Sequence, residues 1–111
     1  SNRSYQKMCR EAGLKVHPAR FPPAFAEFFI KFLTEKNDCV FDLFAGSNTT
    51  GFVAETLERR WIACELSEEY LKGSIFRFDP KTVEITSNSQ PENQKLRKKC
   101  QFCNPPSYLT N

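Results

Sequence analysis

The residues best suited to chemistry are two carboxylates and the turn of small residues that lies between them. Asp42 stands near the end of an apolar run. The small residues 45–51 follow, with glycines at Gly46 and Gly51. Small residues let a backbone approach a bound molecule closely, and a helix beginning there offers unpaired N–H groups. Glu65 ends a second apolar run about 20 residues later, where an acidic side chain can accept both hydroxyls of a ribose. The pattern therefore predicts a nucleoside-binding site.

The same turn narrows the kind of nucleoside. It lacks the spaced G-x-G-x-x-G that brings a pyrophosphate against a helix, which disfavours NAD and flavins. Asp42 can accept a hydrogen bond from N–H groups of the turn or from a ligand ammonium, which a dinucleotide lacks. The residues alone therefore favour S-adenosylmethionine, with a fragment of a dinucleotide oxidoreductase as an alternative.

Length and composition limit the protein classes. The chain of 111 residues is 40% apolar and has 11 Phe, enough for the core of one small domain. A net charge of +3 says little about the partner, and an odd count of five cysteines favours a reducing cytosol. No stretch is apolar enough to cross a bilayer or to serve as a secretory signal. These features predict a soluble cytoplasmic domain without a membrane partner.

The elements that position the turn can be read from apolar spacing. A Phe-rich stripe predicts a helix over about 24–35, whose apolar face we expect in the core with an edge free to face a larger enzyme. Residues 39–44 resemble a strand buried on both faces of a parallel sheet, residues 49–59 a helix, and residues 60–65 a second strand. Ser67 is a plausible N-cap for a third helix that ends near Asp79. The fold class is α/β, with a right-handed crossover.

Three segments follow from these elements. Residues 1–16 form an N-terminal polar segment with helical spacing from Tyr5 to Ala12 and a stop at Gly13, residues 17–80 the ligand-binding lobe, and residues 81–111 a polar and basic tail. Residues 81–85 could form a short strand. Residues 86–94 carry no large apolar side chain, which predicts a linker or mobile tail.

Several ordered motifs resemble one family. They are His17-Pro18-Ala19-Arg20-Phe21-Pro22, the Phe-rich helix, Asp42-Leu43-Phe44-Ala45-Gly46-Ser47-Asn48-Thr49-Thr50-Gly51 and Glu65-Leu66. Together, over about residues 15–78, they resemble the C-terminal lobe of bacterial or phage DNA amino-methyltransferases, in the class whose cofactor motifs follow the catalytic motif. The resemblance implies a partial Rossmann-like S-adenosylmethionine-dependent methyltransferase fold, an incomplete parallel sheet flanked by helices.

The resemblance also implies cofactor contacts, with S-adenosylmethionine as the cofactor. The residues that would line its methionine part are Asp42, Phe44, Ala45, Gly46 and Ser47. Thr49 and Thr50 would meet its carboxylate, Glu65 its ribose and Leu66 its adenine. Ala19, Arg20 and Phe21 would cross the methionine end, whereas His17 reads as a connector residue. Leu43 replaces a frequent Pro of the family, and Asn48 replaces a frequent Gly, a change that the left-handed tolerance of Asn allows.

The implied activity is methylation of the exocyclic amino group of adenine (N6) or cytosine (N4), as in restriction-modification systems. The complete enzyme would bind double-stranded DNA, and a missing catalytic and target-recognition part or a second chain would be needed. We therefore expect this chain alone to bind S-adenosylmethionine weakly and to transfer no methyl group. The alternative is a non-catalytic S-adenosylmethionine-binding or protein-interaction module.

Two features near the end of the chain imitate functional motifs. Asn104-Pro105-Pro106-Ser107-Tyr108 nearly matches the family's catalytic tetrapeptide, but Ser107 displaces the aromatic residue, and residues 96–103 look too basic to form the buried strand that such a motif ends. Cys100 and Cys103 have the spacing of half a zinc site and lack two further ligands. We therefore expect no catalytic residue and no metal site in this chain.

Overall fold

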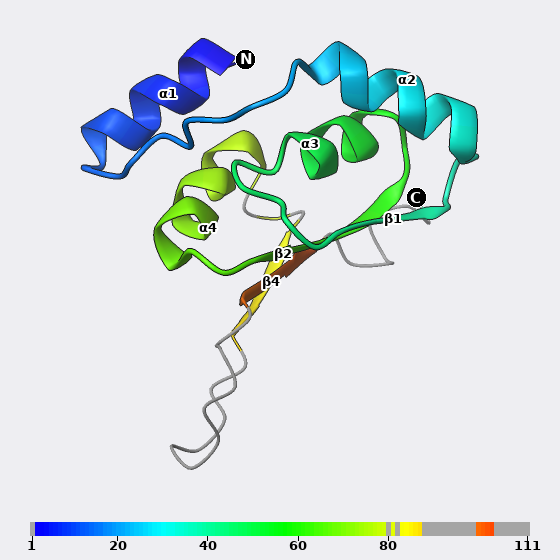
Figure 1. Cartoon of the computed structure of the whole chain (residues 1–111). Helices are drawn as coiled ribbons and strands as arrows, with labels where there is room; N and C mark the ends of the chain where they lie inside the picture. The colour runs from blue at the N-terminus through cyan, green and yellow to red at the C-terminus, as the bar shows by residue number, and fades with distance from the viewer. Residues whose placement is uncertain (1, 80, 82, 88–99, 104–111) are drawn as a thin grey trace.

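A computed structural model of the protein describes residues 2–79, 81, 83–87 and 100–103. Over these residues the chain forms helices on one side of a small sheet (Figure 1). The elements are α1 (Asn2–Glu11), α2 (Pro23–Leu33), β1 (Cys39–Asp42), α3 (Thr49–Thr56), β2 (Arg60–Glu65), α4 (Glu68–Ser74), the 3-10 helix η1 (Ile75–Arg77), β3 (Glu84–Ser87) and β4 (Cys100–Cys103).

Helix α2 begins and ends where its residue types predict. Pro23 occupies the first helical turn, where its missing N–H would have no partner in the helix. At the other end, the backbone N–H and the hydroxyl of Thr34 both donate to the Ile30 carbonyl. The helix expected over about 24–35 is confirmed, with both ends slightly earlier.

The sheet brings the two predicted carboxylates to one face. Its strand order is β1-β2-β4-β3, and β1 and β2 are parallel, as the sequence predicted. The register pairs Val40 with Trp61 and Asp42 with Ala63. Paired residues project to the same face, and side chains alternate along a strand. Asp42 and Glu65, which is two residues beyond Ala63, therefore lie on the same side of the sheet.

The hydrophobic core lies between this face and the helices. Trp61 is almost fully buried and its ring packs on Phe78, with the ring centres 4.7 Å apart. The other buried apolar residues of the cluster come from α2, α3, β2 and α4: Ala26, Ile30, Val53, Ala54, Ala63 and Leu71. The parallel pair is thus covered on its carboxylate-bearing face.

Helix α1 packs onto the same body. Tyr5 and Cys9 are fully buried, and the Cys9 sulfur lies 3.8 Å from the Gly73 carbonyl oxygen of α4. A Cβ at Gly73 would lie 3.1 Å from that sulfur, so the close approach of the two helices favours glycine there. The helical spacing predicted for this segment is confirmed, and the helix ends before Gly13, whose φ is 69°.

Strand β1 is not buried on both faces, contrary to the sequence prediction. Cys39 and Phe41 are exposed, Phe41 by 57%. The strand forms one edge of the described sheet, and none of the described helices covers its outer face (Figure 1). The apolar run therefore has the composition of a strand buried on both faces, but the described residues cover only one of its faces.

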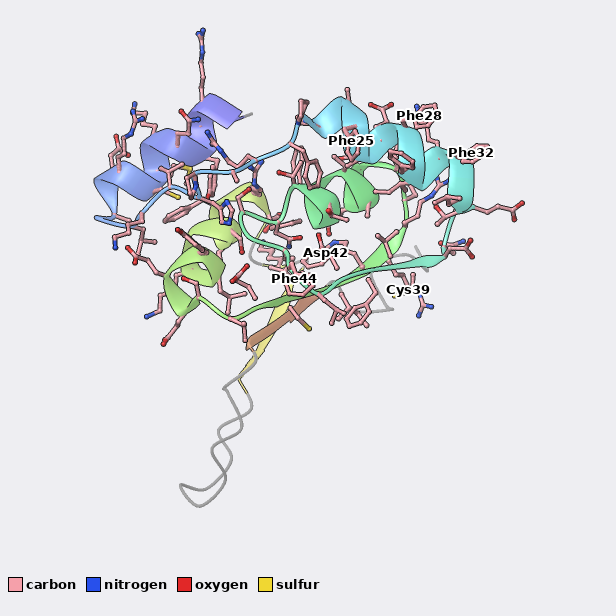
Figure 2. All side chains as sticks on the ribbon, viewed as in Figure 1. Phe25, Phe28, Phe32, Cys39, Asp42 and Phe44 are labelled. Atoms are coloured by element: carbon pink, nitrogen blue, oxygen red, sulfur yellow. The ribbon has the colours of Figure 1, made fainter. Side chains whose placement is uncertain are left out.

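The prediction that the Phe stripe of α2 lies in the core is wrong for all five of its residues. Ala26 and Ile30 are buried, because this side of the helix packs on α3 and the sheet. Five larger apolar side chains are between 43% and 74% exposed: Phe25, Phe28, Phe29, Phe32 and Leu33. Figure 2 shows Phe28 and Phe32 on the outer side of α2, where their rings stack with centres 6.1 Å apart.

The end of the described chain also differs from the prediction. Residues 96–103 were expected to be too basic for a strand, yet Cys100–Cys103 forms β4 between β2 and β3, antiparallel to both. The basic residues precede this uncharged segment, and backbone pairing requires only the segment itself. The sheet is therefore mixed, with β1 and β2 as its parallel pair, and β3 lies at Glu84–Ser87 rather than at 81–85. Residues 88–99 and 104–111 of the predicted tail lie outside the described residues.

Candidate cofactor-binding site

The turn that follows β1 is held by its own carboxylate and by the neighbouring strand. The Phe44 N–H donates to Asp42 Oδ1 at 2.9 Å, one of the two roles predicted for this carboxylate. The Ala45 N–H donates to the Cys64 carbonyl of β2 at 3.1 Å. Figure 2 shows Asp42 and Phe44 where the chain leaves β1. The turn is thereby fixed over the carboxyl ends of both parallel strands.

Glu65 joins two backbone segments through its carboxylate. Its Oε2 accepts from the Gly46 N–H at 2.7 Å, and its Oε1 accepts from the Ser67 N–H at 2.9 Å. The side chain is half-buried, and each carboxylate oxygen has a second lone pair for a further donor. The carboxylate is thus held in one orientation and keeps acceptor capacity for hydroxyl groups.

The start of α3 is capped by the residue that replaces the family glycine. Asn48 has φ 59° and ψ 44°, and its side chain accepts from the Gly51 N–H at 3.0 Å. The prediction that Asn would take a left-handed conformation here is confirmed. Ser47 and Thr49 on either side are buried, with their hydroxyl oxygens 3.4 Å apart. Buried hydroxyls and a helix start are therefore brought together at the turn.

A hollow of about 130 Å³ opens beside Glu65. Its lining is Leu43, Phe44, Cys64, Glu65 and Leu66. Phe44 is 84% exposed and Leu66 is half-exposed, so apolar surface lies next to the half-buried carboxylate. This combination suits a nucleoside, whose base is flat and apolar and whose ribose carries hydroxyls.

Two other predicted residues lie at a second hollow. Phe21 and Thr50 line an apolar groove of about 300 Å³ between α2, α3 and β1. The remaining lining residues are Phe25, Ala26, Phe29, Ile30, Leu33, Thr34 and Val40. The structure therefore brings Phe44, Glu65 and Leu66 together at one hollow, and it places Phe21 and Thr50 at the other.

His17 has a direct role in the geometry of the turn. Gly46 has φ 56°, and a Cβ built there would lie 2.9 Å from the Cδ2 and Nε2 atoms of the His17 ring. The ring centre also lies 4.5 Å from that of Tyr70 in α4. Sequence reasoning treated His17 as a connector residue, whereas the structure packs it against the turn. The sequence signal that could have indicated this role is that His17 stands immediately before Pro18, at the start of a predicted site motif.

Ala19 and Arg20 extend from the same connector. Ala19 is exposed. With the Gln6 amide oriented so that its oxygen faces Arg20, this oxygen accepts from the two terminal guanidinium nitrogens at 2.8 and 2.6 Å. The Arg20 head group is thus directed toward α1.

Arg77 reaches the turn from the end of η1. Its Nε donates to the Ser47 carbonyl at 2.7 Å, and its guanidinium carbon lies 4.3 Å from the centre of the Tyr5 ring. Burial lowers the pKa of Arg77, and the charge of Arg20 lowers it further. Burial also raises the pKa of Tyr5 to about 12, so the phenol is neutral at physiological pH. Sequence reasoning missed Arg77 because no motif around Arg77 relates it to the turn, which precedes β2 and α4 in the chain.

The features suspected of catalysis and metal binding can be placed only in part. Asn104 lies outside the described residues, as do the four residues that follow it. Across the described residues, no group of three or more His, Cys, Asp and Glu side chains is arranged to hold a metal ion. No helix among the described residues is long and apolar enough to cross a membrane.

The parallel strand pair, its small-residue turn and the acidic residue at the next strand end define a partial α/β methyltransferase fold of the Rossmann-like kind. The sequence profile of the DNA methylase family with N6 and N4 specificity matches residues 1–76, and the chain belongs to this family.

Individual relatives agree with this membership. The chain is 54% identical over 78 residues to the type II methyltransferase M.PvuII of Proteus hauseri, covering 70% of this chain and 23% of that protein. It is 40% identical over 63 residues to the DNA adenine methyltransferase YhdJ of Escherichia coli (strain K12), covering 57% of this chain and 21% of that protein. A solved structure of the cytosine-N4-specific PvuII DNA methyltransferase matches with a TM-score of 0.67 and 53% identity, covering 71% of this chain and 28% of that chain. The chain thus spans about a quarter of the length of these relatives.

Proposed function

We propose that this chain forms the S-adenosylmethionine-binding part of a DNA methyltransferase that modifies the exocyclic amino group of adenine (N6) or cytosine (N4). The relatives include a cytosine-N4 enzyme and an adenine enzyme, so membership of the family supports both bases equally. Its place as a C-terminal lobe, after the catalytic motif, is part of the proposal. When bound, the cofactor would supply an electrophilic methyl group.

The observation that carries the proposal is the bridging position of Glu65. Its carboxylate connects the Gly46 and Ser67 backbones and borders the hollow that contains Phe44 and Leu66. Two backbone N–H groups fix the orientation of this carboxylate, and its remaining lone pairs can accept from ribose hydroxyls. We assign the ribose to Glu65 and the adenine to the apolar side chains beside it.

The methionine end of the cofactor would lie over the turn. Asp42 shares a sheet face with Glu65 and keeps lone pairs beyond its bond to the Phe44 N–H. It can therefore accept from the cofactor ammonium. The carboxylate of the cofactor would meet the start of α3, beside Ser47 and Thr49, where the helix dipole favours negative charge.

The exposed apolar surfaces of this chain indicate where the rest of the complete enzyme would bind. Parallel strands are normally covered on both faces, and an exposed apolar area of this kind marks an interaction surface. The outer face of β1 and the Phe side of α2 are accordingly the surfaces that we assign to the catalytic and target-recognition part, on the same chain or on a second one. That assembly would act on double-stranded DNA in the cytoplasm.

Calorimetry tests cofactor binding by the 111-residue chain. We expect S-adenosylhomocysteine and S-adenosylmethionine to bind, NADH not to bind, and Glu65→Ala to weaken binding of S-adenosylhomocysteine about 100-fold. Methyl incorporation into mixed-sequence DNA is expected only when the catalytic part is also supplied.

Three results would contradict the proposal. Binding of NADH would favour an oxidoreductase. A stable oligomer that binds no nucleoside would favour an interaction module. Methyl transfer by this chain alone would show that a catalytic motif lies within it, with Asn104 as the first candidate.

A further inference from the structure

Ser47 is held from outside the turn by one side chain. Arg77 Nε donates to its carbonyl at 2.7 Å, and Arg77 Nη2 donates to its hydroxyl at 3.3 Å. Both the backbone and the side chain of Ser47 are therefore fixed by one guanidinium. Arg77 lies immediately beyond residues 1–76, the range that the family profile matches.

Arg77 is itself fixed by a residue from α1. Its guanidinium carbon lies 4.3 Å from the centre of the buried Tyr5 ring, close enough for a cation–π interaction. A planar group that is stacked on one side and donates on the other has little freedom to move. The N-terminal helix thus reaches the turn through Arg77.

We propose that Arg77 is a positioning residue that sets the subsite for the amino-acid end of the cofactor by fixing Ser47. This inference rests on the proposed function, because it assumes that the methionine end lies over the turn. The adenosine end depends on Glu65, whose carboxylate accepts from the Gly46 and Ser67 N–H groups, whereas Arg77 donates to Ser47 in the turn. Loss of Arg77 therefore weakens binding of the amino-acid end selectively.

Two nucleosides separate the ends of the cofactor. S-adenosylhomocysteine carries the amino acid, and 5′-methylthioadenosine lacks it. For Arg77→Gln in the 111-residue chain, we expect about a tenfold loss of affinity for S-adenosylhomocysteine and less than a twofold change for 5′-methylthioadenosine. Arg77→Lys keeps the charge without the rigid fork, and we expect it to recover only part of the loss.

Arg59→Gln is the matched structural control. Arg59 is buried and donates to the Thr34 hydroxyl, the Thr34 carbonyl and the Leu57 carbonyl, none of which belongs to the turn. We expect this variant to lower the thermal unfolding midpoint and to leave the affinity ratio of the two nucleosides unchanged. The thermal unfolding midpoints of the Arg77 variants show whether either variant fails to fold. If Arg77→Gln does not fold, the affinity ratio of the two nucleosides is measured with Arg77→Lys.

The outcomes are distinguishable. An equal loss for both nucleosides in a folded Arg77 variant, or no loss for either, would overturn the positioning role while the proposed function stands. Failure of the unchanged protein to bind either nucleoside would overturn the proposed function and this inference with it.

Discussion

The turn after β1 and the outer side of α2 reverse the usual distribution of side chains. At the turn, polar residues are buried: Ser47, Asn48 and Thr49 are each less than 5% exposed. On α2, large aromatic residues are exposed, with Phe28 and Phe32 the most open of the Phe side chains of that helix. Folded proteins normally bury aromatic residues and expose polar ones.

The difference is in how far the described residues supply the contacts of each region. They supply hydrogen-bond partners to the turn, and they leave the outer side of α2 uncovered. Around the turn, the hydrogen bonds that Arg77 donates and those that Asn48 and Glu65 accept lie within the described residues. Buried polar groups need such partners to be tolerated. Around α2, neighbouring exposed rings contact one another. The proposed cofactor region is thus held mainly by contacts within the described residues, and the α2 surface is the one that we propose for a partner.

The largest expected effect tests the two sides of α2. Ile30→Ala should lower the free energy of unfolding by about 2–4 kcal/mol, because Ile30 is buried and its loss leaves a cavity. Phe32→Ala, on the exposed side, should change it by less than about 0.5 kcal/mol. Urea unfolding followed by circular dichroism measures both. A loss above 2 kcal/mol for Phe32→Ala would show that the outer side is covered in solution.

Glu65 is the largest single contributor expected on the turn side. Glu65→Ala removes the acceptor for the Gly46 and Ser67 N–H groups, and we expect affinity for S-adenosylhomocysteine to fall about 100-fold. Glu68→Ala is the matched control, because Glu68 is exposed and forms a surface ion pair with Lys72. Calorimetry of both variants is the measurement. Equal affinities would contradict the ribose assignment.

A pair of glycines tests the contact between the turn and His17. Gly46 and Gly13 both have positive φ, so alanine is strained at either position, but Gly13 has no atom within 4 Å of an added Cβ. We expect Gly46→Ala to weaken nucleoside binding about tenfold and Gly13→Ala to leave it unchanged. His17→Ala should restore part of the binding lost in Gly46→Ala. No recovery in the double variant would mean that backbone strain alone explains the loss.

The smallest expected effect concerns Glu55 on α3. Burial raises the pKa of Glu55 from 4.5 to about 7, while Trp61 lowers it and Asp79 raises it further. The folded state therefore retains a proton that the unfolded state loses, and stability falls as the pH rises from about 4.5 to 7. Glu55→Gln should remove this slope and gain about 1 kcal/mol at pH 8, a figure that allows for solvent screening. Unfolding at pH 5 and pH 8 measures it, and an unchanged slope would exclude Glu55 as the cause.

The parts of the fold that depend on local pattern were predictable from the sequence. The parallel pair β1 and β2, the Ser67 cap and the left-handed Asn48 each follow from residues next to one another in the chain. The burial of β1 and α2 was not predictable. Apolar spacing identifies the face that needs a cover, but it does not say whether the same segment of chain supplies that cover.

The candidate site divides in the same way. Asp42, Gly46 and Glu65 were predicted as site residues because the turn and the strand ends carry a recognisable order of residue types, and the structure brings them together. The contacts of His17 and Arg77 with the turn arise only after helices distant in sequence pack together. Phe21 and Thr50 line the groove between α2, α3 and β1, a placement that adjacency in a motif did not indicate, and their contact with the cofactor stays a prediction.

The two hydrogen bonds that the Glu65 carboxylate accepts affect how backbone amides of the protein exchange hydrogen with heavy water. The amide protons of Gly46 and Ser67 are held by the two oxygens of one carboxylate, so release of that group exposes both at once. We expect these two amides to exchange deuterium at matched rates and to slow together when a nucleoside binds. Their shared exchange rate would report the occupancy of the site from within the backbone.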